Sequence, residues 1–375
     1  MPTSDPFVFD DLSLDHIRFH VRDIDTTLSW LTGGYGLAVR AVSRPGTGPG
    51  DEAGARSVEV GANGITLVLT EAVTDDHPAA QYVERHGDGV ADIAMRVPDA
   101  TAAHAAAVAR GARSVAAPTR TGDVVTASVG GFGDVVHTFV ERPGGAGGPA
   151  VPGMRPVPRA VGAMENSLRS VDHFAVCVNP GDIDGTVEFY RNVFDFELTF
   201  TEKLQIGSQA MTTKVVESRS GDVTLTLIEP DITQDRGHIN EFLDDHGCAG
   251  VQHIAFSTDD IVATVAELRR RGVAFMGTPD AYYRTLSDRV VPTRYTVEEL
   301  HGEEVLVDED HGGQLYQIFA KSVHPKNTIF LELIERMGAR TFGSGNITAL
   351  YEAAERQRGA AGAASGTSGT ESRAA

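Results

Sequence analysis

The sequence is poor in cysteine, since only Cys177 and Cys248 occur among 375 residues. Two cysteines cannot build a disulfide framework, so we expect a reducing cytoplasm and two small, buried, unpaired thiols. No apolar run approaches the roughly 18 residues that a membrane span needs. The first residues, MPTSDPFVFDDLS, lack the basic start and apolar stretch of a signal peptide. We therefore expect neither a membrane protein nor a secreted one.

Positive charge is also scarce. The chain has 32 Lys and Arg residues against 52 Asp and Glu residues, which gives a formal net charge of −20 at pH 7. Because affinity for nucleic acid depends on Lys and Arg that neutralise phosphates, we expect no nucleic-acid partner. Hydrophobic residues make up 41% and charged residues 22%, which is typical of globular proteins with a proper core. At roughly 150 residues per domain, this length predicts two domains.

An internal repeat organises the chain. Segments of the first half return in the second half, and each predicts a strand that leads into a helix or pairs with further strands. Three pairs of segments match: LDHIRFHV and VDHFAVCV, from Leu14 and Val171; GVADIAM and GVQHIAF, from Gly89 and Gly250; and DVVHTFVER and NTIFLELIER, from Asp134 and Asn327. The repeat predicts an α+β fold of two tandem domains, each built from paired βαβββ modules.

Composition predicts where the domains begin and end. We place the first domain at residues 13–143 and the second at residues 166–357. Residues 144–165 are rich in Gly and Pro, as expected of a linker. Residues 358–375 offer almost no apolar bulk to bury, so we expect a disordered tail.

The repeat also identifies candidate metal ligands. Matching positions hold different residues in the two halves: His16, Asp92 and Thr138 in the first, and His173, His253 and Glu332 in the second. Two imidazoles and a carboxylate form the facial arrangement that non-haem Fe(II) oxygenases use. A single histidine in a strand is more often structural, but a carboxylate within the apolar segment IFLELIER is costly to bury without a partner. We therefore predict a metal site in the second domain and none in the first.

Longer motifs carry a family resemblance. Together VDHFAV, CAGVQHIAF, DEDHGGQLYQIFAK, TIFLELIERMGA and TFGSGNITALYEA resemble the 4-hydroxyphenylpyruvate dioxygenases and 4-hydroxymandelate synthases of the vicinal-oxygen-chelate superfamily. The resemblance runs from about Leu12 to Glu355. It implies a glyoxalase-like fold, with an open, barrel-like sheet around Fe(II) in the second domain. It also implies 4-hydroxyphenylpyruvate and O2 as substrates, and a homodimer.

Two departures from the dioxygenase pattern favour the synthase branch. The segment TLIEP has Ile228 where the dioxygenases typically have Asn, and TFGSGNI has Ile347 where they have an aromatic residue. By this resemblance the product is 4-hydroxymandelate, formed by oxidative decarboxylation and benzylic hydroxylation. The alternative is homogentisate, the product of the dioxygenase branch.

The resemblance further implies a set of residues near the substrate: Thr213, Ile228, Gln252, Gln317, Phe319, Phe330, Phe342 and Ile347. Each Phe, taken singly, fits plain core packing better than a place beside the substrate. No catalytic residue beyond the metal centre is expected, and His238, where the family commonly has Gln, receives no role.

Two other functions remain open on the residues alone. The same architecture serves in small-molecule-binding modules without catalysis. Extradiol ring-cleaving dioxygenases also use two His and one Glu, but they normally add acid–base histidines, for which no second-half histidine is clearly placed. A test of whether oxygen consumption depends on a 2-oxo acid distinguishes an extradiol dioxygenase from an enzyme of the 2-oxo-acid family.

Overall fold

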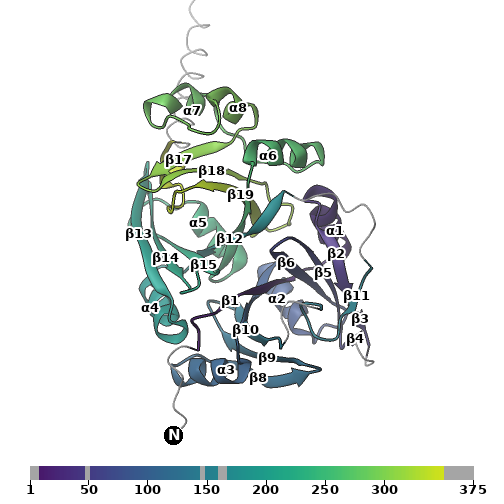
Figure 1. Ribbon diagram of the computed structural model, residues 1–375. Helices are drawn as coiled ribbons and strands as arrows, with labels where there is room; N and C mark the ends of the chain where they lie inside the picture. The colour runs from purple at the N-terminus through teal and green to yellow at the C-terminus, as the bar shows by residue number, and fades with distance from the viewer. Residues whose placement is uncertain (1–7, 47–50, 144–147, 159–166, 350–375) are drawn as a thin grey trace, which may run out of the picture.

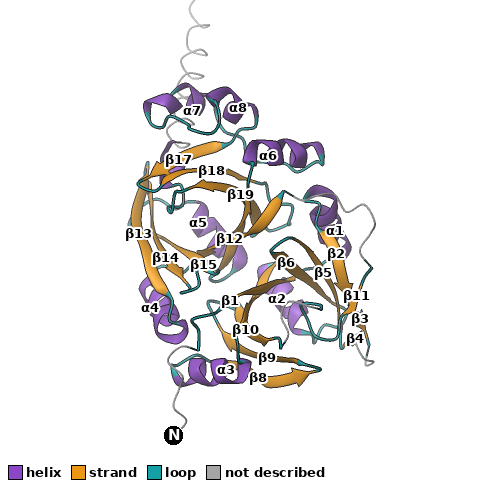
Figure 2. Cartoon of the chain, viewed as in Figure 1, coloured by secondary structure: helices purple, strands orange, loops and turns teal. Residues whose placement is uncertain are grey.

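A computed structural model describes residues 8–46, 51–143, 148–158 and 167–349. The expected tail, residues 358–375, lies outside the described residues, as do residues 144–147 and 159–165 of the expected linker. Within the described residues, one sheet has nine strands and the next has eight. Figure 1 shows these two curved sheets side by side, and Figure 2 shows most of the helices on their outer sides.

The first sheet contains two βαβββ modules. The first module comprises β1 (Ser13–His20), α1 (Ile24–Ser29), the π-helical turn η1 (Trp30–Gly34), β2 (Ala38–Val42), β5 (Ala55–Ala62) and β6 (Ile65–Ala72). The second comprises β7 (Gly89–Arg96), α3 (Ala100–Ala109), β8 (Ser114–Thr121), β9 (Val124–Gly130) and β10 (Val136–Glu141). The strand order is β11-β2-β5-β6-β1-β7-β10-β9-β8. Helix α2 (Pro78–His86) connects the two modules.

Three short strands complete this half. Strands β3 (Arg44–Pro45) and β4 (Asp51–Glu52) pair with each other as a small separate ribbon. Strand β11 (Arg155–Pro156) lies within the expected linker and pairs with β2, so this part of the linker extends the edge of the first sheet.

The second sheet repeats the plan. Its first module comprises β12 (Leu168–Cys177), α4 (Ile183–Phe194), β13 (Glu197–Ile206), β14 (Gln209–Glu217) and β15 (Thr224–Pro230). Its second comprises β16 (Gly250–Thr258), α6 (Ile261–Arg270), β17 (Leu306–Asp310), β18 (Gly313–Phe319) and β19 (Phe330–Met337). The strand order is β13-β14-β15-β12-β16-β19-β18-β17, and α5 (His238–His246) connects the modules. Helix α7 (Asp280–Arg284), turn η2 (Leu286–Asp288) and helix α8 (Val297–Gly302) lie between α6 and β17.

Equivalent local signals begin equivalent helices. The Asp99 carboxylate accepts a hydrogen bond from the Ala102 amide at the start of α3, and Asp260 does the same for the Ala263 amide at the start of α6. An N-terminal Asp of this kind satisfies amides that the helix itself leaves unpaired. These repeated elements and the two sheets confirm the predicted α+β fold of paired βαβββ modules.

One continuous hydrophobic core joins the two sheets. Phe194 of α4 packs against Phe139 of β10 with ring centroids 6.0 Å apart. His137 of β10 lies 2.7 Å from the Tyr190 hydroxyl through Nε2, and 3.2 Å from the Ile93 carbonyl through Nδ1. A carbonyl can only accept, so Nδ1 carries the proton and Nε2 accepts from Tyr190. His137 is therefore a neutral imidazole whose two nitrogens are both satisfied.

This buried histidine makes stability depend on pH. Burial lowers the pKa of His137 to about 4, and its hydrogen bond to Ile93 only partly opposes that effect. A group with a lowered pKa contributes its full stability above its unfolded pKa of 6.5 and loses it as the pH falls towards 4. We expect a loss of about 3 kcal/mol across this window. Urea unfolding at pH 7 and pH 5 measures the loss in the free energy of unfolding between the two pH values. This loss should be smaller in His137→Gln than in the wild-type protein, because Gln can keep both hydrogen bonds but cannot titrate. Equal losses in the two proteins would contradict the assignment of a neutral, buried His137.

Candidate metal centre

Three neighbouring strands hold the predicted metal ligands. His173 lies on β12, His253 on β16 and Glu332 on β19. In the sheet register, Ala255 of β16 pairs with His173 on one side and with Glu332 on the other. His253 precedes Ala255 by two residues, so its side chain lies on the same face of the sheet. The three ligands therefore converge because of strand register, although about 80 residues separate each from the next.

The ligand atoms of the three side chains lie within 4.8 Å of one another, and all three residues are buried. Glu332 Oε2 is 3.1 Å from His253 Nε2 and 3.5 Å from His173 Nε2. Among the described residues, these imidazoles are the only ion-pair partners of the Glu332 carboxylate. Such a carboxylate requires a cation or a proton close by, because an unpaired buried charge is very costly.

A carboxylate and an arginine orient His173. The Asp172 carboxylate accepts a hydrogen bond from His173 Nδ1 at 2.8 Å, and Arg336 donates twice to the same carboxylate, at 2.8 Å each. A β-bulge at Asp172 makes the first contact possible, since consecutive strand residues ordinarily face opposite sides. Although burial raises the pKa of Asp172, the bonds from Arg336 and His173 outweigh it and hold that pKa well below its usual range. With Nδ1–H held by Asp172, the lone pair of Nε2 faces Glu332.

His253 is oriented in a similar way. Its Nδ1 lies 3.2 Å from Gln252 Oε1, and a second bulge places the extra residue at Gln252. Burial lowers the pKa of His253, and the neighbouring Glu332 only partly opposes this. The ring is therefore neutral near pH 7. Two neutral imidazole nitrogens and one carboxylate oxygen are a donor set that fits a divalent metal ion.

The predicted substrate residues surround this group or lie along the same sheet. Three Phe rings touch the ligand imidazoles: Phe330 stacks on His253 at 4.9 Å between centroids, and Phe319 meets the same ring edge-on at 5.7 Å. Phe342 meets His173 edge-on at 5.0 Å. These contacts fix the imidazole planes, which is a packing role whether or not the rings also touch a substrate.

Besides Gln252, the predicted set has two other polar members and two aliphatic members. Gln317 is 1% exposed, and its Oε1 has no hydrogen-bond partner among the residues that the structure describes. Thr213 pairs with Ile228 across β14 and β15. Ile228 and Ile347 pack against one small apolar cluster, formed by Cys177, Ile206, Met211, Ile239 and Phe242. The part of these residues in binding substrate stays a prediction, but the two isoleucines on which the expectation of the synthase branch rests pack against the same cluster.

The turn before Ile347 fits closely against Gln317. Gly343 has a φ of +73°, and a side chain there would place Cβ 2.2 Å from Gln317 Oε1. Only glycine meets both the backbone conformation and the space at this position. The segment 343–347 therefore approaches Gln317 and the cluster beneath Ile228 at close range.

The first half has the carboxylate and the arginine that orient the first histidine, but it lacks the full set of three metal ligands. The Asp15 carboxylate bonds His16 Nδ1 at 2.8 Å and also pairs with Arg142. Asp92 accepts from the Thr138 hydroxyl at 2.5 Å, so these two side chains satisfy each other. A cavity of about 260 Å³ lies beside them. The first half thus retains an Asp–His–Arg arrangement in which Thr138 replaces the third ligand.

Two residues near functional positions were missed or misjudged from sequence. Cys177 is buried as expected, but the same prediction was wrong for Cys248, which is half-buried and lies next to two histidines. Its partners are distant in sequence, and one of them comes from the other half. His238 begins α5 and is partly exposed to solvent, yet the protein packed around its ring and the charge of His253 lower its pKa, although Glu241 opposes this. That electrostatic influence places His238 in the surroundings of the metal ligands.

Comparison with known proteins agrees with this architecture. Residues 13–141 and 170–318 match the Glyoxalase/Bleomycin resistance protein/Dioxygenase superfamily. A probable 4-hydroxyphenylpyruvate dioxygenase 2 of Aspergillus fumigatus is 33% identical, over 92% of this chain and 94% of the relative. A 4-hydroxyphenylpyruvate dioxygenase of Dictyostelium discoideum is 32% identical, over 92% and 97%.

A solved structure of a 4-hydroxymandelate synthase is also similar to this chain. A triply substituted 4-hydroxymandelate synthase from Streptomyces coelicolor is 40% identical, with a TM-score of 0.83 over 92% of this chain and 98% of that one. The chain therefore belongs to the glyoxalase/bleomycin resistance protein/dioxygenase superfamily, within the family of the 4-hydroxyphenylpyruvate dioxygenases and 4-hydroxymandelate synthases. Among the described residues, none of the helices combines the length and apolar character of a membrane span.

Proposed function

We propose that the chain converts 4-hydroxyphenylpyruvate and O2 into 4-hydroxymandelate and CO2, with Fe(II) held by His173, His253 and Glu332. The reaction balances without a further reductant, because decarboxylation of the 2-oxo acid supplies two of the four electrons that O2 accepts and the hydroxylated benzylic carbon supplies the other two. The observation that carries the proposal is the apolar cluster against which both Ile228 and Ile347 pack. Cys177 of this cluster follows His173 by four residues on β12, so the cluster and the metal ligand lie on the same face of the sheet.

The donor set supports the choice of metal. His173 and His253 direct neutral nitrogen lone pairs towards the Glu332 carboxylate, and the three-ligand group contains no thiolate. Two imidazoles and one carboxylate are the ligands of non-haem Fe(II) oxygenases. When bound, Fe(II) would bind the 2-oxo acid group of the substrate and activate O2 beside it.

The protein's own part is to orient the substrate and exclude water. Within the described part of the chain, the buried Gln317 carboxamide has an acceptor oxygen without a partner, which suits the hydroxyl of a phenol. Ile228 and Ile347 present an apolar wall, so the aromatic ring can pack there without leaving a polar group unpaired. Phe330, Phe319 and Phe342 hold the imidazoles by ring contacts and reduce the access of water.

Product analysis tests the proposal. The protein is incubated with Fe(II), ascorbate and 4-hydroxyphenylpyruvate in air, and products are separated against authentic standards, because 4-hydroxymandelate and homogentisate are isomers. A 4-hydroxymandelate peak supports the synthase reaction. Homogentisate would overturn it in favour of the dioxygenase reaction, and no oxygen uptake with iron bound would favour a small-molecule-binding module.

The double variant Ile228→Asn with Ile347→Phe should shift the product ratio towards homogentisate by at least about tenfold, which corresponds to roughly 1.4 kcal/mol between the two barriers. A polar amide and a ring change both the polarity and the space of the wall on which the substrate ring would pack. Leu243→Met, which alters the same cluster from α5, is the matched control and should leave the ratio unchanged. An unchanged ratio in the double variant would remove these two residues from the branch choice.

We further propose a cytoplasmic location and a homodimer. The two cysteines occur without a disulfide, which suits a reducing compartment. Light scattering coupled to size-exclusion chromatography measures the mass directly and would reject the dimer if it gave the 39.8 kDa of one chain.

A further inference from the structure

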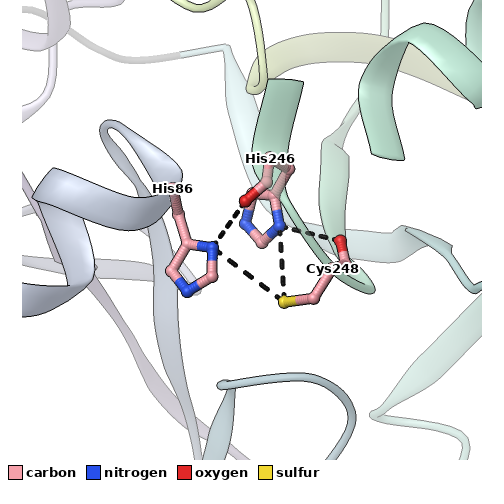
Figure 3. Close-up of side chains that lie close together, drawn as sticks. All are labelled: His86, His246 and Cys248. Atoms are coloured by element: carbon pink, nitrogen blue, oxygen red, sulfur yellow. Dashed lines mark hydrogen bonds between the residues drawn. The ribbon is translucent and has the colours of Figure 1, made fainter. Parts of the chain in front are cut away.

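A second group of metal-binding side chains lies where the two halves meet (Figure 3). His86 is the last residue of α2 in the first half, and His246 is the last residue of α5 in the second half. Their rings stack with centroids 4.4 Å apart and an angle of 23° between the planes. Cys248 follows two residues after His246, and the ligand atoms of all three residues lie within 4.8 Å of one another.

We propose that His86, His246 and Cys248 bind a zinc-type divalent cation that joins the two halves of the chain. Cys248 Sγ lies 3.9 Å from His86 Nδ1 and 3.8 Å from His246 Nδ1. A tetrahedral zinc ion has Zn–S and Zn–N bonds of about 2.3 and 2.0–2.1 Å, which puts sulfur and nitrogen roughly 3.5 Å apart. The two sulfur-to-nitrogen distances are therefore within a few tenths of an ångström of those in a zinc site, and rotation of the stacked imidazoles away from their backbone carbonyls would turn the nitrogen lone pairs towards the ion. Thiolate with imidazole is the donor set that selects zinc.

The surroundings of the cluster favour a cation. Helices α2 and α5 contact each other and both end here, so the negative ends of two helix dipoles meet at the cluster. Asp134 Oδ2 lies 2.9 Å from His86 Nε2. A carboxylate behind a ligand imidazole fixes the ring and strengthens its bond to the metal. Cys248 is half-buried, which gives solvent, and hence an ion, access to the fourth coordination position.

Backbone carbonyls satisfy the ligand atoms in the metal-free protein. His86 Nδ1 donates to the His246 carbonyl at 2.6 Å, and His246 Nδ1 donates to the Cys248 carbonyl at 2.9 Å. The Cys248 thiol donates to the Ala249 carbonyl at 3.2 Å. His86 Nε2 lies beside Asp134, so both nitrogens of this ring have an acceptor within hydrogen-bond distance.

The proton balance of binding follows from these bonds. His86 releases its Nδ1 proton and stays a neutral ligand with Nε2–H on Asp134. Cys248 releases its thiol proton, and the proton on His246 moves from Nδ1 to Nε2. The ligand atoms therefore give up protons as they bind the ion. No oxidation or reduction is involved.

Cobalt substitution tests this site directly. Metal-free full-length protein is titrated with Co(II) and followed by absorption, because a cysteine thiolate bound to Co(II) gives a sulfur-to-metal charge-transfer band. His173, His253 and Glu332 contain no sulfur, so the band reports only on the cluster at Cys248. We expect two equivalents of Co(II) per chain with the band, and one equivalent without it in Cys248→Ser. Cys177→Ala is the matched control and should keep the band.

Zinc affinity gives a second measurement. In competition with a chromophoric chelator, Asp134→Asn should bind the second zinc ion about 10–100-fold more weakly, as expected on loss of a carboxylate behind a ligand imidazole. His86→Gln should abolish that binding. Absence of the charge-transfer band in the wild-type protein, or its survival in Cys248→Ser, would refute the proposal. Either result leaves the proposed oxygenase reaction untouched, since product formation is measured separately.

Discussion

A His173→Gln variant is expected to lose both iron binding and turnover, whereas the matched His16→Gln variant keeps both. The two histidines occupy equivalent strand positions, and each donates through Nδ1 to the preceding Asp at 2.8 Å. Only His173 directs its other nitrogen towards a carboxylate and a second imidazole within ligand distance. The loss should exceed the roughly 10–100-fold that removal of a residue behind a ligand causes.

Iron content and oxygen uptake measure the two consequences separately. Protein loaded with Fe(II) and passed through a desalting column is analysed for iron per chain, and oxygen uptake is followed with 4-hydroxyphenylpyruvate. Circular dichroism of both variants controls for folding. Full iron retention by His173→Gln, or equal losses in both variants, would contradict the assignment of the metal centre to the second half.

An Asp172→Asn variant should lose stability and iron affinity together, and Asp15→Asn should lose stability alone. Asp172 accepts one bond from His173 and two from Arg336, so its neutralisation leaves Arg336 without its carboxylate. Breaking a buried pair in this way costs about 3 kcal/mol. The loss of His173 orientation should weaken iron binding by about 10–100-fold. Asp15 makes the corresponding bonds to His16 and Arg142, where no iron is expected.

Denaturant unfolding of the metal-free proteins and iron titration against a chelator give these two quantities. Comparing Asp172→Asn with Asp15→Asn removes the effects that any Asp→Asn change would have beside a histidine and an arginine. If Asp15→Asn weakened iron binding as much as Asp172→Asn, the effect would be global destabilisation rather than orientation of a ligand. Unchanged iron affinity in Asp172→Asn would show that His173 needs no carboxylate to hold its ring.

The repeat predicted the architecture and the ligand positions because equivalent residues of the two halves occupy equivalent register positions in the sheets. The long spacing of the ligands along the sequence does not by itself indicate that they lie close together. His16, Asp92 and Thr138 occupy register positions equivalent to His173, His253 and Glu332, as the alignment of the repeats required. Features without a counterpart in the repeat escaped prediction. The strand β11 in the expected linker pairs through backbone groups, which leave little trace in side-chain pattern. The helices α7 and α8 have no equivalent in the first half.

The bulges also lay beyond sequence reasoning. At Asp172 and Gln252 one extra residue shifts the register, and the bulge brings a neighbouring side chain onto each ligand imidazole. Nothing in the alternation of apolar and polar residues marks such a shift. The exposure of Cys248 was misjudged for a related reason: its histidine partner His86 is 162 residues away and meets it only through the packing of the two halves.

The ligand strands belong to different modules of the second sheet. Strand β12 opens one βαβββ module, while β16 and β19 open and close the next, and the hydrogen-bonded seam between β12 and β16 passes through the ligand group. A single module thus carries one ligand or two, never the full set. A shorter ancestor with only one module would have needed to pair two copies edge to edge before it could hold an ion at this seam. The covalent link between the two modules makes that pairing permanent, and it allows the two sides of the seam to carry different ligands.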